Sequence, residues 1–339
     1  MAVKCGSPWN EKQKKEWKRY SDLESELIEK TYQTKERQVQ LEQHIIDFKY
    51  IVQISKSNSN KKRPVKREVV EVGHYLRQKR FSYPEKPIKL FGSSDRCWKK
   101  SEFIFEWMQR NRAITSYPNI QWREIVEQAA KGILNEGKLL NREPEGQLIA
   151  NELRNVKDKT TDEILKLAIH LYSVESFLYK LVNSTLRADD RSQIDTLGAY
   201  CYLLDRYFSE YHTIPLNNVP QNNKRLTVYR GATLTDEMID AYEKVVGTCI
   251  KWSAFTSTSK DPKVAEQFDG NTLFIIQLGA GYIRRSDISS LSYYPEEQEV
   301  LLDAASHFQV DKLEYNSKSG KYLIYLTDGS TSYRIDTRY

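Results

Sequence analysis

The hydrophobic pattern of this chain changes its period once, near residue 225, and this change limits the folds available to it. Between residues 97 and 212, apolar residues recur three and four positions apart, which is typical of amphipathic helices. From Leu226 onward, short runs rich in β-branched and aromatic residues replace that pattern, and 272–278 is the clearest of them. A block of helices followed by a block of strands predicts an α+β fold.

The strand block can be divided further at its polar stretches. We expect strands over 226–231, 250–259, 272–278, 297–302, 307–314 and 321–327, with helical segments over 238–242 and 262–268. The helical block before it is expected to end with an amphipathic helix over 194–208.

A smaller α+β module precedes the helices. Helical spacing over 25–32 is followed by β-prone runs that we expect to form strands over 39–41, 44–54 and 61–67. Pro84, Pro87 and Gly92 then interrupt any periodic pattern. These breaks predict a module over 1–80, a linker over 81–96, and a domain over 97–339 with a helical lobe (97–224) and a β core (225–339).

Composition excludes several classes of protein. The chain has 339 residues and a net charge of +6, and residues 1–80 carry 19 Lys and Arg against 11 Asp and Glu, or +8. This imbalance suggests a polyanionic partner for the module, although a solvated basic surface would produce it as well. The four cysteines form no CxxC pair, and no run of about 18 apolar residues exists. We therefore expect an intracellular chain with no metal site and no membrane partner.

A cluster of carboxylates directly precedes one of the expected strands. Glu297 and Glu299 follow Pro295 and lead into the apolar residues Val300 and Leu301. Because side chains alternate along a strand, the two glutamates are expected to face the same way, where their like charges repel. Paired carboxylates suit the cleavage of a glycosidic bond, whose transition state is positively charged. The alternative is a solvated acidic turn before a buried strand.

Three motifs occur in order along the strand block. They are Tyr229-Arg230-Gly231, then the hydroxyl-rich run 255–259, and then Glu297-Gln298-Glu299. Each is common alone, but together, and with these flanking strands, the chain over roughly 97–330 resembles the mono-ADP-ribosyltransferases of the Arg–Ser–Glu class. The resemblance implies two mainly antiparallel sheets around a cleft for NAD, which is the substrate, with no metal.

The resemblance implies a role for each motif residue. Arg230 would bind the pyrophosphate of NAD, and the backbone of Gly231 would approach the nicotinamide amide. Ser257 would orient Glu299, which would bond to the ribose 2′-hydroxyl and stabilise the oxocarbenium-like transition state. Glu297 would hold the acceptor guanidinium, because the second Glu marks arginine specificity in this family.

Two further contacts follow from the same resemblance. The loop from Arg284 to Pro295 would present the protein acceptor, with Tyr293 or Tyr294 as an aromatic contact. Phe268 would line the nicotinamide side, although packing within its own helix explains that residue equally well.

The N-terminal module resembles the WWE domain. The two tryptophans and the glutamate that give this domain its name match Trp9, Trp17 and Glu29. We expect both tryptophans to pack in the core of the module. The rest of the match covers the β-prone run over 44–54 and the basic strand over 61–67.

Some WWE domains bind the iso-ADP-ribose unit of poly(ADP-ribose), and others serve mainly as interaction modules. The ligand contacts of the domains that bind it fall on Gln53 and Arg63, which would bind an adenine edge and a phosphate. Two positions depart from the well-known binders, because Asn10 and His44 stand where those domains carry Tyr.

Together these features predict an NAD-dependent arginine mono-ADP-ribosyltransferase targeted by its WWE-like module, with hydrolysis of NAD as a side reaction. Its partners would be NAD, a protein with an exposed arginine and, through residues 1–80, poly(ADP-ribose). Two alternatives remain open: a non-catalytic ADP-ribose-binding adaptor, and a transferase that modifies another nucleophile. The basic run over 61–67 permits nucleic-acid binding without requiring it, and we expect no nucleic-acid partner.

Overall fold

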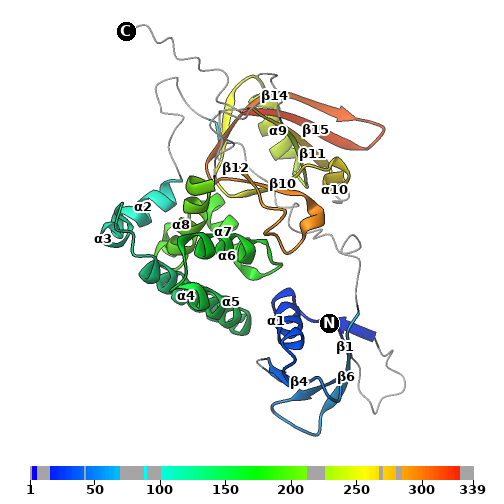
Figure 1. The fold of residues 1–339 in the computed structure, drawn as a ribbon. Coiled ribbons are helices and arrows are strands. Elements are labelled where there is room, and N and C mark those ends of the chain that lie inside the picture. The colour runs from blue at the N-terminus through cyan, green and yellow to red at the C-terminus, as the bar shows by residue number, and fades with distance from the viewer. Residues whose placement is uncertain are drawn as a thin grey trace.

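The computed structural model describes residues 2–5, 16–41, 43–68, 88–89, 101–211, 226–266, 270–279 and 285–328. Figure 1 shows a small N-terminal module in blue, a lobe of helices in cyan and green, and a large sheet in yellow to red. The separation of helices from strands confirms the predicted α+β fold.

The N-terminal module folds as one helix against a six-stranded sheet with the order β2-β1-β6-β5-β4-β3. Its elements are β1 (Ala2–Cys5), β2 (Glu16–Arg19), α1 (Asp22–Gln33), β3 (Gln38–Gln40), β4 (His44–Asp47), β5 (Val52–Ser55) and β6 (Lys62–Lys66). Ser21 caps α1 in a reciprocal capping box with Glu24, which fixes where the helix begins. Ile28 from the helix packs against Ile46 and Val65 from the sheet.

The prediction of one long strand over 44–54 is wrong. A turn divides it into β4 and β5, and Ile51 in that turn has a φ of 52°. The carboxylate of Asp47 accepts hydrogen bonds from the amides of Lys49 and Tyr50, which stabilises the turn. The residues of this run favour a strand, but the Asp47 side chain accepts hydrogen bonds from backbone amides that a continuous strand would use for pairing.

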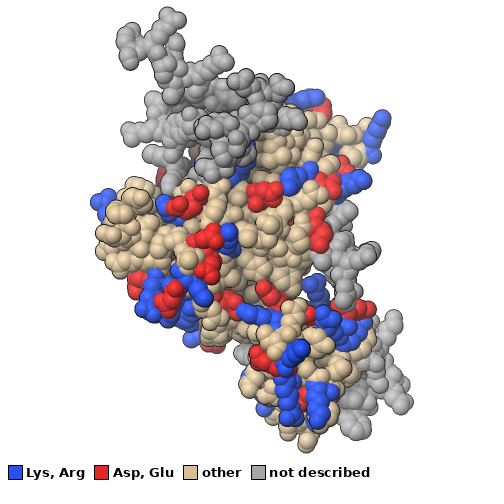
Figure 2. Space-filling view, viewed as in Figure 1, with Lys and Arg blue, Asp and Glu red and all other residues tan. Residues whose placement is uncertain are grey.

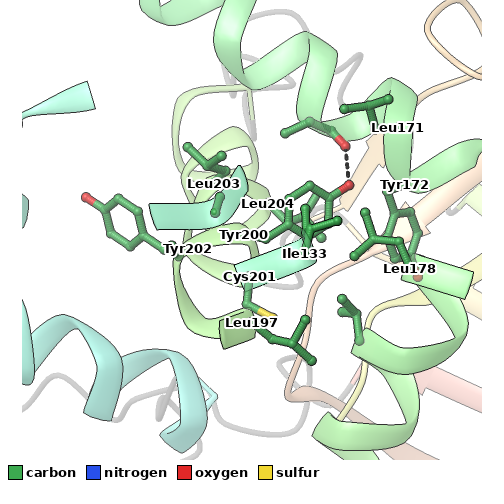
Figure 3. Close-up of a cluster of buried hydrophobic side chains, with 14 of the residues drawn as sticks. Ile133, Leu171, Tyr172, Leu178, Leu197, Tyr200, Cys201, Tyr202, Leu203 and Leu204 are labelled. Carbon is green, nitrogen blue, oxygen red and sulfur yellow. Dashed lines mark hydrogen bonds between the residues drawn. The ribbon is translucent and has the colours of Figure 1, made fainter. Parts of the chain in front are cut away.

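Among the described residues, the helical lobe contains the largest hydrophobic core. Its helices are α2 (Glu102–Arg110), α3 (Arg112–Thr115), α4 (Trp122–Leu139), α5 (Glu143–Val156), α6 (Thr161–Ser173), α7 (Phe177–Ala188) and α8 (Ile194–Tyr211). Figure 3 shows side chains of α8 meeting those of neighbouring helices, with the Tyr200 hydroxyl donating to the Ala168 carbonyl oxygen at 2.8 Å. Burial raises the pKa of the Cys201 thiol in this core, so the thiol is structural rather than reactive.

Two helices of the lobe approach each other at a glycine. A Cβ placed on Gly132 of α4 would lie only 1.7 Å from the carbonyl oxygen of Thr196 in α8. Backbone lies on both sides of this contact, so no side chain can move to make room.

Replacing Gly132 by alanine should therefore lower the free energy of unfolding of the lobe by about 2–3 kcal/mol, because α4 and α8 must separate. Calorimetric melting of Gly132→Ala beside wild type measures the effect. Lys131→Ala, on the exposed side of the same helix, is the control and should change stability by less than about 0.5 kcal/mol. An unchanged melting temperature in Gly132→Ala would contradict the close helix contact.

The β core is a nine-stranded sheet with the order β12-β13-β10-β8-β11-β15-β14-β9-β7. Its strands are β7 (Ile88–Lys89), β8 (Leu226–Ala232), β9 (Cys249–Trp252), β10 (Thr256–Ser259), β11 (Thr272–Leu278), β12 (Arg285–Asp287), β13 (Glu299–Leu302), β14 (Ser306–Asn316) and β15 (Lys321–Asp328). Two helices accompany them: α9 (Asp236–Lys244) and α10 (Pro262–Glu266). Only β11 and β15 pair in parallel, and the other described pairs are antiparallel.

The sheet is nearly divided into the two parts that the resemblance implies. Among the described residues, β10 and β8 are joined through a single pair, Ser259 with Tyr229. On one side, Leu301 of β13 and Phe255, which directly precedes β10, join the core of the helical lobe. On the other side, β8, β11 and β15 enclose a second core with α9. β13 also contributes Val300 and Leu302 to this second core. The two parts of the sheet therefore meet at one described residue pair, and β13 packs one face against each core.

One strand prediction in this region is wrong. The run over 250–259 forms two strands, of which β9 pairs with β14 and β10 pairs with β13. The break falls at Ser253 to Phe255, where the ring of Phe255 stacks on Phe208 of the helical lobe. Ile250 and Trp252, before the break, pack in the second core, whereas Ala254 and Phe255, within the break, pack in the core of the helical lobe. The apolar run therefore contains residues of two different cores.

Candidate active site

Arg230 lies where the two parts of the sheet separate. It follows Tyr229, whose pairing with Ser259 is the described link between β8 and β10. The Arg230 side chain is buried, and its Nη1 donates to the carbonyl oxygen of Ser257 at 2.9 Å. The guanidinium therefore spans the opening between the strands and fixes β8 relative to β10. Gly231, the next residue on β8, lies opposite Leu273 of β11.

Glu299 begins β13 and lies directly opposite Ser259 of β10, while Ser257 lies opposite Leu301. Residues two apart on a strand share a face, so Ser257, Ser259 and Glu299 face the same side of the sheet. Ser257 is thus a diagonal neighbour of Glu299, within reach for a polar contact. Glu299 is fully buried, and Ser257 is 3% exposed.

The expectation that Glu297 and Glu299 lie on one strand and share a face through its alternation is wrong. Glu297 ends a single turn of 3-10 helix, η4 (Pro295–Glu297), and Gln298 follows in the left-handed region with a φ of 47°. The strand begins only at Glu299. Both carboxylates are nevertheless buried, so the solvated acidic turn is wrong as well. The turn, rather than the pleat of a strand, brings Glu297 to the site.

Sequence reasoning named only Ser257 from the hydroxyl-rich run, and it missed Ser259. The Ser259 hydroxyl donates to the carbonyl oxygen of Glu297 at 2.7 Å, and the next amide, Lys260, donates to Gln298 at 3.2 Å. Ser259 therefore holds the backbone of the turn that carries Glu297. The spacing of two between Ser257 and Ser259 was the available signal, because it places both hydroxyls on one face.

Tyr293 and Tyr294, the predicted acceptor contacts, both bond to the N-terminal module. Tyr294 is 4% exposed and its hydroxyl donates to the carboxylate of Asp22 in α1. The Tyr293 hydroxyl donates to the Asp22 carbonyl oxygen at 3.2 Å. Both phenol groups are thus engaged by the N-terminal module, so in this structure neither stands free to contact an acceptor.

His170 of α6 connects the same loop to the module. Its Nδ1 lies 2.8 Å from the Leu291 carbonyl oxygen, and its Nε2 lies 3.2 Å from both carboxylate oxygens of Glu26 in α1. Both partners are acceptors, so both ring nitrogens must carry protons, which describes the charged imidazolium. Burial alone would lower the pKa of His170, but the hydrogen bond and charge of Glu26 raise it above its ordinary value.

The contact between His170 and Glu26 should stabilise the packing of the N-terminal module against the helical lobe more at acidic pH than at alkaline pH. The raised pKa of His170 contributes stability that is present below the unfolded-state pKa of about 6.5 and is lost as pH rises through the folded-state pKa. We expect His170→Gln to lower stability by up to about 1 kcal/mol at pH 6 and to have little effect at pH 9. Denaturant melts at the two pH values measure the difference.

Glu26→Gln should remove the same pH dependence, since Glu26 is the main charge facing His170. Glu152 of α5 also raises the pKa of His170, and the Tyr293 ring lies 6.2 Å from the imidazole. A larger effect of His170→Gln at pH 9 than at pH 6 would show that the imidazole is held in its neutral form.

The candidate ligand residues of the module lie side by side. Gln53 and Arg63 are opposite each other on β5 and β6, so their side chains share a face. Gln53 is buried and accepts a hydrogen bond from the Tyr20 hydroxyl at 2.6 Å, whereas Arg63 is exposed. His44 lies near enough that Arg63 contributes to lowering its pKa, after the larger effect of burial. Figure 2 shows Lys and Arg residues gathered on this module, at the lower right.

The residues that give the WWE domain its name have different environments. Trp17 is 41% exposed, with the Lys66 ammonium 4.9 Å from its ring centroid, so the expectation that it packs in the core is wrong. Glu29 forms two hydrogen bonds with the guanidinium of Arg67, at 2.8 and 3.0 Å, which lowers the pKa of that glutamate. The ion pair between Glu29 and Arg67 connects α1 to the residue that follows β6.

Three of the expected positions lie outside the described residues, namely Trp9, Asn10 and Phe268. Across the part of the chain that the structure describes, no group of three His, Cys, Asp or Glu side chains is placed to hold a metal ion. The helices described include none that is both long and apolar enough to cross a bilayer.

Comparison with known families assigns two separate parts of the chain. The family model for NAD:arginine ADP-ribosyltransferases matches residues 148–332, which is more than half of the chain, and the model for the WWE domain matches residues 8–67. The chain therefore belongs to the NAD:arginine ADP-ribosyltransferase family and carries a WWE domain at its N-terminal end.

Individual relatives share only part of their length with this chain. The erythroblast NAD(P)(+)–arginine ADP-ribosyltransferase of Gallus gallus is 29% identical over 159 residues, which is 44% of this chain and 47% of that protein. A candidate NAD(+)–arginine ADP-ribosyltransferase of Mycobacterium avium, Mav, is 38% identical over 99 residues, 29% of this chain and 11% of that protein. The chain thus spans about half of the chicken relative and about a tenth of the mycobacterial one.

Among solved structures, the type III effector XopAI from Xanthomonas axonopodis pv. citri is 17% identical. The match covers 68% of this chain and 99% of that chain with a TM-score of 0.43. This score is too low to add to the family assignment.

Proposed function

We propose that this chain is an NAD-dependent mono-ADP-ribosyltransferase that transfers ADP-ribose to arginine side chains of a protein acceptor and releases nicotinamide. The observation that carries the proposal is the convergence of Arg230, Ser257 and Glu299 at the opening between the two parts of the sheet. These residues come from three strands that are separated by long stretches of sequence. Family membership supports their assignment to one site.

The residues around the opening fit the chemistry of NAD. Arg230 is a buried cation at the strand opening, and a planar guanidinium matches the oxygens of a pyrophosphate. Gly231, beside it, has no side chain to obstruct a nicotinamide amide. NAD supplies the glycosidic bond that breaks, and the protein supplies the groups that orient it.

Glu299 is the residue that stabilises the developing positive charge. It is fully buried, and an unscreened carboxylate interacts far more strongly with a nearby cation than one in water does. Ser257, its diagonal neighbour on β10, keeps the carboxylate facing the substrate. Any water that enters instead of an acceptor would give hydrolysis of NAD.

Glu297 is proposed to select arginine as the acceptor. An arginine side chain is protonated at neutral pH and is a poor nucleophile until a base removes a proton. A buried carboxylate at the end of η4 can both bind the guanidinium and accept that proton. Tyr293 and Tyr294 remain proposed acceptor contacts only for a state in which they leave Asp22.

A set of matched peptides tests the choice of acceptor. Four peptides of one sequence would present Arg, Lys, Asn or Cys at a single position, and each would be incubated with the full chain and NAD. The proposal predicts a mass increase of one ADP-ribosyl group on the Arg peptide alone. Modification of another peptide, with the Arg peptide unmodified, would assign a different acceptor.

We also propose that the WWE domain binds ADP-ribose groups on modified targets inside the cell, through Arg63 and Gln53. Arg63 is exposed on a basic strand and faces the same side as Gln53. Binding there would raise the local concentration of acceptors through the tether between the domains. For the domains themselves, the division at 1–80, 81–96 and 97–339 remains a proposal.

A further inference from the structure

The WWE domain contacts the loop that leads to Glu297, and one aspartate makes most of this contact. Asp22, the first residue of α1, is 6% exposed. Its carboxylate accepts hydrogen bonds from the Tyr294 hydroxyl and from the Glu175 amide, the latter at 3.2 Å. Arg19 forms an ion pair with the other carboxylate oxygen at 3.3 Å. The Asp22 carbonyl oxygen accepts from the Tyr293 hydroxyl.

Asp22 is therefore a buried anion whose partners come from both domains. Hydrogen bonds to a charged acceptor are stronger than neutral ones, and a donor left unsatisfied in a buried site is costly. The Tyr294 side chain is 4% exposed, and the Asp22 carboxylate fixes the position of its hydroxyl by accepting its hydrogen bond.

Tyr294 in turn sets the position of Glu297. It is the residue before η4, and its carbonyl oxygen accepts from the Glu297 amide at 3.1 Å. Its own amide donates to the Ser292 hydroxyl at 3.1 Å. One turn of 3-10 helix therefore connects the phenol to Glu297, whose carbonyl oxygen is held from the other side by Ser259.

We propose that Asp22 of the WWE domain is a positioning residue of the transferase site, acting through Tyr294 to hold Glu297 in place for the acceptor arginine. This inference rests on the proposed function. Arg230, Ser257 and Glu299 lie on strands of the sheet, so the ladder rather than α1 sets their positions. Asp22 consequently affects transfer to the acceptor arginine, whereas cleavage of NAD depends on the residues of the sheet.

The test compares four variants of the full chain: Asp22→Ala, Asp22→Asn, Tyr294→Phe and the double variant Asp22→Ala/Tyr294→Phe. Transfer to agmatine, a small arginine analogue, would be measured as kcat and KM, and nicotinamide release would be measured without agmatine. We expect Asp22→Ala and Tyr294→Phe each to lower kcat/KM for agmatine about tenfold. The double variant should lower kcat/KM no further than either single variant, because both substitutions remove the same contact between Asp22 and Tyr294.

Two features separate positioning from general damage to the fold. Asp22→Ala should change nicotinamide release less than about twofold, and Asp22→Asn should keep most transfer because its amide oxygen still accepts from Tyr294. The matched control is Asp162→Ala, which removes an aspartate–tyrosine contact with Tyr211 between α6 and α8. It should leave both rates unchanged.

Unchanged or faster transfer in Asp22→Ala would overturn the proposal, as would an equal loss of transfer and nicotinamide release. If the wild type modifies no acceptor, the proposed function fails, and the contact is tested by hydrogen exchange. Asp22→Ala should then speed exchange at the amides of Tyr294 and Glu297. Unchanged exchange at both amides would overturn the positioning role itself.

Discussion

Replacing Glu299 by glutamine is expected to slow nicotinamide release from NAD by about 10²–10³-fold. Glutamine keeps the shape of the side chain and removes its charge. The substitution should therefore remove the stabilisation that we propose Glu299 gives to the positive charge that develops as the glycosidic bond breaks. The effect is large because Glu299 is fully buried at the start of β13, where water screens the charge little. Chromatographic measurement of nicotinamide, with NAD as the sole substrate, gives the rate.

Glu296→Gln is the matched control for this substitution. Glu296 lies one turn away in η4, is exposed, and loses the same charge when it is replaced. Its variant should keep the wild-type rate. More than a tenth of wild-type activity in Glu299→Gln would show that another group carries the charge stabilisation.

Replacing Glu297 by glutamine is expected to separate two activities. Transfer to agmatine should fall by about 10²-fold or more, because glutamine can neither pair with a guanidinium nor accept its proton. Nicotinamide release should persist with water as the acceptor, because the roles that we propose for Arg230, Ser257 and Glu299 do not involve Glu297. Mass spectrometry of ADP-ribosyl-agmatine, run beside the nicotinamide measurement, gives the ratio.

The same Glu296→Gln control applies, and it should keep both activities. Equal loss of both activities in Glu297→Gln would place Glu297 in the cleavage of NAD rather than in binding the acceptor. Undiminished transfer would assign arginine recognition to a different residue.

In the candidate site, the backbone positions that lie on strands could be predicted from sequence, and the positions set by turns could not. Arg230 and Glu299 fall on β-prone runs whose strands the structure confirms, and alternation puts each on a definite face. Glu297 was assigned to the same strand because its neighbours are apolar and β-prone. The left-handed Gln298 ends that pattern, and no local propensity of glutamine indicates this conformation.

The contact between domains could not be predicted for a different reason. The sequence predicts that Tyr293 and Tyr294 are exposed loop residues, because no residue near them in sequence is an obvious hydrogen-bond partner for a phenol. Their partner, Asp22, is more than 270 residues away and belongs to a module with its own small core. The hydrophobic pattern specifies which residues each core buries, but the surfaces that meet between two cores carry no periodic signal.

The most direct test of the account measures NAD turnover by the full chain with and without agmatine. We predict that nicotinamide is released in both conditions, and that ADP-ribosyl-agmatine forms in proportion to the nicotinamide released when agmatine is present. Binding of NAD without release of nicotinamide, under either condition, would contradict the account. The chain would then be an ADP-ribose-binding adaptor whose function lies in residues 1–80.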